Sequence, residues 1–119
     1  MAKILILDDD LGRHTQFKQN MIGHVLTHCE TVEECINALE TDEFDYVCLD
    51  HDLGGEQMVM SGKGTGYEVA QWMAKNEHPS LREVFVHSLN PAGRKNIVAE
   101  LKSAGIRASE YPFMWTKKV

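Results

Sequence analysis

The sequence lacks the features that a disulfide framework, a zinc knuckle or a membrane segment needs. It has only three cysteines, Cys29, Cys35 and Cys48, and no two of them have the spacing of a CxxC pair. Its longest apolar run, Ile4–Leu7, is too short to cross a bilayer or to form the core of a signal peptide. We therefore expect buried or half-buried thiols and a protein that resides in the cytoplasm.

The chain is also short of basic residues. It has 12 lysines and arginines against 18 acidic residues, which gives a formal net charge of −6 at pH 7. A broad nucleic-acid surface needs a basic stripe that displaces counterions, so no extended surface of that kind is expected. A small phosphorylated ligand needs only a few cations. The candidates for that role are Arg13, Lys63, Arg94 and Lys95.

Strand and helix signals alternate along the chain, whose 119 residues suffice for one domain over residues 1–119. The predicted strands are residues 3–8, 25–29, 44–50, 84–86 and 106–111. Helix starts follow at Leu11, at the capping boxes Thr31 with Glu34 and Thr65 with Glu68, and at Asn90 before Pro91. This alternation predicts a three-layer α/β sandwich with a parallel sheet. Only seven residues follow Pro112, so a final helix is expected to be absent or vestigial.

Polar side chains follow four of the predicted strands. These residues are Asp8–Asp10, Asp50–Asp52, His87–Ser88 and Tyr111. Because ligands of parallel sheets bind beyond the carboxyl ends of the strands, we expect one pocket there. The long loop over residues 53–66 contains Gly54, Gly55, Gly62, Gly64 and Gly66, and it is expected to be mobile or closely approached by a ligand.

Two histidines are the candidates for proton transfer in this pocket. His51 and His87 each end a predicted strand, and an imidazole has an ordinary pKa of about 6.5, which suits a general acid or base at a phosphodiester. The alternative is that either ring only hydrogen-bonds a carboxylate. His14, on the first predicted helix, is expected to be exposed.

Four carboxylates, from Asp8, Asp9, Asp50 and Asp52, are too many for one spot unless a cation offsets their repulsion. Hard oxygen ligands indicate Mg²⁺, with Mn²⁺ as an alternative, and a histidine ligand would favour Mn²⁺, iron or Zn²⁺. Asp10 is more readily explained as a cap of the first helix.

A phosphate group has its own candidates. Asn90 begins a helix whose free N–H groups point to the same edge, and Ser88 adds a hydroxyl. Arg94 lies about one turn inside this helix, where it can reach a phosphate or remain a solvated surface residue. Lys63 can close over a ligand from the glycine-rich loop.

These residues resemble the landmarks of the receiver domain of two-component response regulators. The resemblance rests on the segments 4–10, 45–50, 66–69 and 111–113. It implies a flavodoxin-like fold with the strand order 2-1-3-4-5 and Mg²⁺ on Asp8 and Asp9. It also implies that Asp50 is the position of the phosphoacceptor and that Ser88 is the switch hydroxyl.

The sequence departs from an ordinary receiver in several places. Tyr111 stands where the family has a lysine that contacts the acyl phosphate, and without this cation a phosphoaspartate loses a charge partner. His51 and Asp52 replace a short loop after the acceptor, and the following loop is longer. The fourth strand ends in the segment 87–91, where a receiver has Thr or Ser followed by Ala.

The residues at these departures, together with Arg13, are similar to those of cyclic-phosphate processing receiver domains. That resemblance implies action on cyclic phosphate ends or cyclic nucleotides, in phage and RNA-repair settings. The leading hypothesis is a metal-assisted phosphoesterase in which Asp50, His51 and His87 are catalytic. The alternatives are a non-enzymatic receiver that is phosphorylated on Asp50 or binds a partner protein, and a module that sequesters a nucleotide. The oligomeric state is not predicted.

Overall fold

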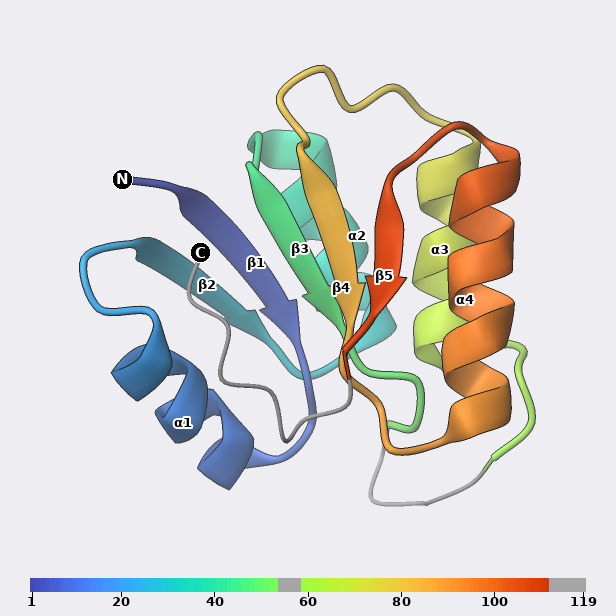
Figure 1. The fold of residues 1–119 in the computed structure, drawn as a ribbon, viewed down its shortest axis with the longest axis horizontal. Coiled ribbons are helices and arrows are strands. Elements are labelled where there is room, and N and C mark those ends of the chain that lie inside the picture. The colour runs from blue at the N-terminus through green and yellow to red at the C-terminus, as the bar shows by residue number, and fades with distance from the viewer. Residues whose placement is uncertain (54–58, 112–119) are drawn as a thin grey trace.

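Five parallel strands form the centre of the computed structural model, which describes residues 1–53 and 59–111 (Figure 1). Their bounds are β1 Lys3–Leu7, β2 Val25–Cys29, β3 Tyr46–Leu49, β4 Glu83–Val86 and β5 Ala108–Glu110. The strand order is β2-β1-β3-β4-β5. The α/β class, the parallel sheet and its order 2-1-3-4-5 are thus confirmed, and β1, β3 and β4 occupy the centre.

Within the described residues, four helices connect the strands and complete the three layers. Their bounds are α1 Leu11–Asn20, α2 Val32–Thr41, α3 Gly66–Ala74 and α4 Pro91–Ser103. Helix α1 packs on one face of the sheet, and α2, α3 and α4 pack on the other (Figure 1). Gly105, with φ of +79°, follows α4 in the left-handed region that glycine adopts without strain.

The core is divided by the sheet because successive side chains of a strand point to opposite faces. In β1, Leu5 and Leu7 contact the side of α2, α3 and α4, whereas Ile4 and Ile6 contact the side of α1. All four are fully buried, as a central parallel strand covered on both faces requires. This strand therefore holds its next residue, Asp8, at a fixed position.

Some details differ from the sequence-based expectations. Thr65 caps α3, but the Glu68 carboxylate accepts a hydrogen bond from the Gly64 N–H, so the second capping box is not formed. Strand β5 covers only Ala108–Glu110, which is shorter than predicted. Gly54 and Gly55 of the predicted loop lie outside the described residues, and so do Pro112 and everything after it. Among the described helices, none is long and apolar enough to span a membrane.

Candidate functional site

The parallel register brings three of the predicted site residues together. Leu7 pairs with Leu49, and Leu49 pairs with Val86, so these three residues end their strands in one row. The residues that follow them are Asp8, Asp50 and His87. One ligand atom from each of these three lies within 4.8 Å of the other two, and all three residues are buried. We call this group the acidic cluster.

Asp8 is the most heavily bonded member of the acidic cluster. Its Oδ1 accepts from the Asp10 N–H (2.8 Å) and from Arg13 Nη2 (2.9 Å). Its Oδ2 accepts from Arg13 Nε (2.7 Å) and from His87 Nε2 (2.9 Å). Burial alone would raise the pKa of Asp8, but the hydrogen bonds from His87 and Arg13 hold it well below its ordinary value. Asp8 is therefore ionised, and in its hydrogen bond with His87 the proton is on the His87 Nε2 atom.

Arg13 brings a cation onto the same carboxylates. Its side chain extends from the first turn of α1, is 25% exposed, and bonds both oxygens of Asp8 in a fork. Nη2 also donates to Asp50 Oδ2 over 3.3 Å. The hydrogen bonds to Asp8 hold the pKa of Arg13 above its ordinary value. The sequence assigned Arg13 to a phosphate, whereas the structure places it on the predicted metal ligands.

The negative charge of Asp50 is stabilised less by its neighbours than that of Asp8. Its side chain is 6% exposed, and its Oδ1 accepts from the His51 N–H over 2.8 Å. Burial raises the pKa of Asp50 to about 6, which the neighbouring His87 and Arg13 offset only in part. A carboxyl group with such a pKa can exchange a proton near neutral pH.

The imidazole of His87 is fixed from two sides. Its ring packs edge-on against Phe17 of α1 with the ring centroids 5.1 Å apart, and its Nε2 is bonded to Asp8. His87 is 1% exposed. The helix on one face of the sheet and the strand end thus hold the ring in a single orientation at the edge of the acidic cluster.

His51 belongs to a different network. Its Nδ1 donates to Asp52 Oδ1 (2.7 Å), and its Nε2 accepts from the Ser61 hydroxyl (2.8 Å). The Ser61 oxygen also accepts from Asn96 of α4. Both ring nitrogens of His51 therefore have partners outside the acidic cluster, which among the described residues comprises only Asp8, Asp50 and His87. The two predicted proton carriers thus belong to different hydrogen-bond networks.

A glycine of α4 makes room for the His51 ring. A Cβ atom at Gly93 would lie only 2.4 Å from Cγ of His51 and 2.7 Å from its Nδ1. The ring therefore lies directly on the helix backbone, at 0% exposure. No pattern in the sequence indicates this contact, because Gly93 and His51 are far apart along the chain.

The predicted phosphate ligands at the start of α4 already have partners. Asn90 Oδ1 accepts from the Gly93 N–H, and its amide nitrogen donates to Asp52 Oδ1 (3.1 Å) and to the Val59 carbonyl (3.0 Å). Ser88 Oγ accepts from the Asn90 N–H. Arg94 donates to the Ser88 carbonyl and to Glu110. These contacts mainly fix the beginning of α4.

Asp9 and Lys63 line a cavity of about 540 Å³ beside the acidic cluster. The other lining residues are Glu30, Thr31, Val32, Glu33, Leu53, Gly64 and Glu68. The Asp9 carboxylate lies 3.9 Å from Arg13 Nη2. The Asp10 carboxylate caps α1, as predicted, by accepting from the N–H groups of Gly12 and Arg13. Lys63 is exposed and lines the same cavity.

A pair of histidines supports Asp8 from behind and was missed by the sequence analysis. His14, expected to be exposed, is 6% exposed, and its Nε2 contacts the Asp8 carbonyl oxygen at 2.6 Å. Its Nδ1 contacts His28 Nδ1. The only available signal was that position 14 lies one turn before Phe17 and thus on the same helix face.

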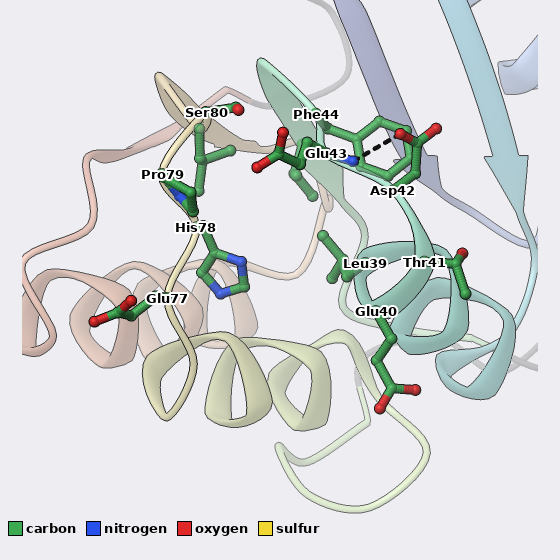
Figure 2. A pocket seen from close by; sticks show the side chains of 12 residues that line it. Leu39, Glu40, Thr41, Asp42, Glu43, Phe44, Glu77, His78, Pro79 and Ser80 are labelled. Carbon is green, nitrogen blue, oxygen red and sulfur yellow. Dashed lines mark hydrogen bonds between the residues drawn. The ribbon is translucent and has the colours of Figure 1, made fainter.

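A second cavity lies at the opposite end of the sheet, before β3 and β4. Figure 2 shows this space of about 290 Å³, with Leu39 and Phe44 on one side and His78 and Pro79 on the other. Its rim is acidic, and none of the predicted site residues lines it. The candidate site is therefore the acidic cluster and not this cavity.

Solved structures confirm the class of fold. The chain is similar to a CheY-like receiver domain from Methanospirillum hungatei (21% identity over 94% of this chain and 81% of that one, TM-score 0.69). It is also similar to TrrA from Thermotoga maritima (21%, 94% and 85%, 0.67) and to CheY4 from Vibrio cholerae (16%, 94% and 86%, 0.70). Identities this low show the fold alone, and that fold is the receiver domain.

The family is narrower than this class. Residues 3–103 match the Cyclic-phosphate processing Receiver domain, a match that extends from β1 to the end of α4. The chain belongs to that family, as the resemblance of its motifs implied. No curated protein matches the chain.

Proposed function

We propose that the protein hydrolyses a small cyclic phosphate, either a 2',3'-cyclic phosphate end or a cyclic nucleotide. The observation that carries this proposal is the acidic cluster, in which two carboxylates and an imidazole from adjacent strand ends meet within 4.8 Å, with a guanidinium across them. Membership of the Cyclic-phosphate processing Receiver domain family supports the substrate class.

The carboxylates of Asp8 and Asp50 would hold a divalent cation, Mg²⁺ or Mn²⁺. The donors fit, because both are hard oxygen ligands and the raised pKa of Asp50 reflects the cost of burying its charge, which His87 and Arg13 offset only in part. A similar receiver, TrrA, was solved in complex with Mg²⁺ and BeF. Asp9 lies beside these ligands, whereas the Asp52 carboxylate is bonded to His51 and Asn90. A bound cation would supply a Lewis acid at the phosphoryl oxygens and activate a water molecule.

The proton transfers are assigned to Asp50 and His87. Asp50, a buried carboxylate at the centre of the acidic cluster, accepts a proton from the water that attacks phosphorus. As the bond from phosphorus to one ribose oxygen breaks, His87, as an imidazolium paired with the Asp8 carboxylate, gives a proton to that oxygen and is left as the neutral imidazole. The product is a phosphomonoester, and Arg13 is near enough to the acidic cluster to neutralise its growing charge.

The remaining site residues position these groups. His51 and Asp52 link the loop at Ser61 to Asn90 and α4, and the His51 N–H holds Asp50 Oδ1. We assign His51 a positioning role, because both of its ring nitrogens are engaged there. Ser88 and Arg94 fix the start of α4 next to the site.

The rest of the ligand would occupy the cavity beside Asp9. A volume of about 540 Å³ lies within the usual range of small-molecule sites, roughly 300–1,000 Å³. Leu53 and Val32 offer apolar contacts, and Lys63 supplies a cation. These features suit a single nucleoside attached to the phosphate.

The test is hydrolysis of 2',3'-cyclic nucleotides, with EDTA or with Mg²⁺ or Mn²⁺. His87→Ala is expected to lower kcat by about 10²- to 10⁴-fold, the usual contribution of a general acid. The matched control is His78→Ala, because His78 lies at the opposite end of the sheet and bonds the Met73 carbonyl. No hydrolysis of any cyclic phosphate by the folded protein would refute the proposal.

The second candidate is a non-enzymatic receiver that is phosphorylated on Asp50. Asp50 directly follows β3, the position that the receiver resemblance gives to the phosphoacceptor. Against this, Asp50 is buried and its oxygens are bonded to Arg13 and to the His51 N–H. Tyr111 supplies no cation for an acyl phosphate.

Acetyl phosphate separates the two candidates. We expect no gain of phosphoryl mass after incubation with this donor and Mg²⁺. A gain that Asp50→Asn abolishes would favour the receiver. Tight binding of a cyclic nucleotide that is recovered unchanged would instead indicate a sequestering module.

A further inference from the structure

The proposed cation and the Arg13 guanidinium would bind the same carboxylate oxygens. The proposed cation needs oxygens of Asp8 and Asp50, yet Arg13 already bonds three of the four oxygens of these carboxylates. With the bonds from Asp10 and His87, each oxygen of Asp8 accepts twice. A carboxylate offers about four lone-pair sites in all, so no acceptor site of Asp8 remains for a metal.

Electrostatic repulsion also opposes the binding of Arg13 and a divalent ion to the same carboxylates. A guanidinium on these oxygens and a divalent ion on the same oxygens would be two cations a few ångströms apart in a largely buried place, where repulsion is screened less than in water. Arg13 is a resident cation of this kind, since its charge is not lost by deprotonation in proteins. One cation must leave when the other binds.

The Arg13 side chain also lies near Asp9 and Asp10, outside the acidic cluster. Its side chain is 25% exposed, and its Nη1 lies 3.6 Å from the Asp10 carboxylate, which is itself 49% exposed. The guanidinium thus already reaches toward solvent on the side of Asp10, and Asp9, which lines the large cavity, lies 3.9 Å from Nη2. A rotation of the side chain toward Asp9 would bring the guanidinium from the carboxylates to the cavity that Asp9 lines.

We propose that Arg13 and a divalent cation exclude one another on Asp8 and Asp50, and that arrival of the cation hands the guanidinium over to the phosphate of the ligand. Without metal, Arg13 neutralises the carboxylates and keeps the site closed. With metal, the same fork binds two phosphate oxygens, for which its geometry is equally suited. This inference rests on the proposed metal site but not on catalysis.

Mn²⁺ binding tests the exclusion directly, measured by calorimetry and by the EPR signal of free Mn²⁺ at neutral pH. Arg13→Gln is expected to bind Mn²⁺ about tenfold more tightly than the wild type, or more, a typical size for coupling between two ligands of one site. The matched control is Lys18→Gln, which removes one positive charge from the same helix and is expected to leave Mn²⁺ affinity unchanged.

Arg13→Lys guards against a folding defect of the Gln variant. It keeps the charge but not the fork, so Mn²⁺ affinity should rise less than in Arg13→Gln, and circular dichroism reports whether each variant is folded. Unchanged or weaker Mn²⁺ binding in both folded variants would overturn the exclusion. So would Mn²⁺ binding too weak to detect in all of them.

The handover is tested with inorganic phosphate as the probe. Mn²⁺ should strengthen phosphate binding to the wild type more than to Arg13→Gln, because only the wild type releases a guanidinium. An equal effect of Mn²⁺ in both proteins would overturn the handover. None of these measurements uses a cyclic phosphate, so a failure of the proposed hydrolysis would not be confused with a failure of this inference.

Discussion

Two buried carboxyl groups lie side by side at the strand ends, and their pKa values shift in opposite directions. Asp8 receives hydrogen bonds from His87 and Arg13, which outweigh its burial and lower its pKa. Asp50 has weaker partners, so burial prevails and its pKa rises to about 6. A carboxyl group such as Asp50, whose ionised form destabilises the folded state, is typical of functional sites.

Asp50→Asn is therefore expected to stabilise the metal-free protein. Between pH 4 and 6 the folded state retains the Asp50 proton that the unfolded state has lost, so stability falls as pH rises through this range. At pH 7 a rise from 3.8 to about 6 corresponds to roughly 3 kcal/mol. Urea unfolding in EDTA should show the Asn variant more stable at pH 7 and less pH-dependent.

Asp8 acts in a separate pH range. Its lowered pKa contributes stability above about pH 4 that is lost at more acidic pH, so it does not obscure the effect of Asp50. An Asn variant at position 50 that is no more stable than the wild type at pH 7 would contradict the assigned charge cost.

The sequence predicted part of the site at this scale. Asp8, Asp50 and His87 each directly follow an apolar strand, so the rule for parallel sheets was enough to group them. It was not enough for Arg13, because whether a side chain on the first helical turn reaches outward or back over the strand ends depends on tertiary geometry. His51 follows its strand by one more residue and therefore points into a different network.

At the scale of elements, the contact between α4 and His51 has a measurable consequence. In an exposed helix Gly→Ala stabilises by roughly 1 kcal/mol. At Gly93 we expect the opposite, a loss of about 1–3 kcal/mol from overpacking, since the new methyl group would overlap the His51 ring. Thermal or urea unfolding measures the difference.

The control for this substitution is Gly62→Ala. Gly62 has no atom within 4 Å of an added Cβ, so its substitution should change stability little. If Gly93→Ala were as stable as the wild type or more so, the His51 ring would not be held against the helix in solution. The Ser61 link between the loop and α4 would then also be in doubt.

Element boundaries were predicted well where local chemistry decides them. Thr31 with Glu34 forms the predicted capping box, and Asn90 caps α4 with Pro91 at its first turn. The prediction for Glu68 was wrong, because the Gly64 N–H lies within its reach and competes for the carboxylate. Strand β5 was predicted too long, since an edge strand is fixed by its one neighbour rather than by its own pattern.

At the scale of the whole molecule, net charge distinguishes a mononucleotide from a longer substrate. The chain carries a formal charge of −6, which repels a polyanion, while a cyclic mononucleotide has a single charge. We expect kcat/KM for an oligonucleotide with a 2',3'-cyclic phosphate end to be lower than for the mononucleotide and to rise with added salt, as screening weakens repulsion.

A series of KCl concentrations measures this effect. Extended phosphate contacts would give the reverse, a steep fall of kcat/KM with salt, because counterions released on binding would then compete. That outcome would contradict the prediction that the protein has no extended nucleic-acid surface.

Tyr111 directly follows the end of β5, where the candidate site meets the core of the fold. Its ring packs edge-on against Phe85 with centroids 5.4 Å apart, in the cluster on the α1 side of the sheet. A lysine at this position would remove an aromatic contact from the core at the same time as it added a cation to the site. We therefore expect Tyr111→Lys to lower the free energy of unfolding unless the packing around Phe85 changes with it.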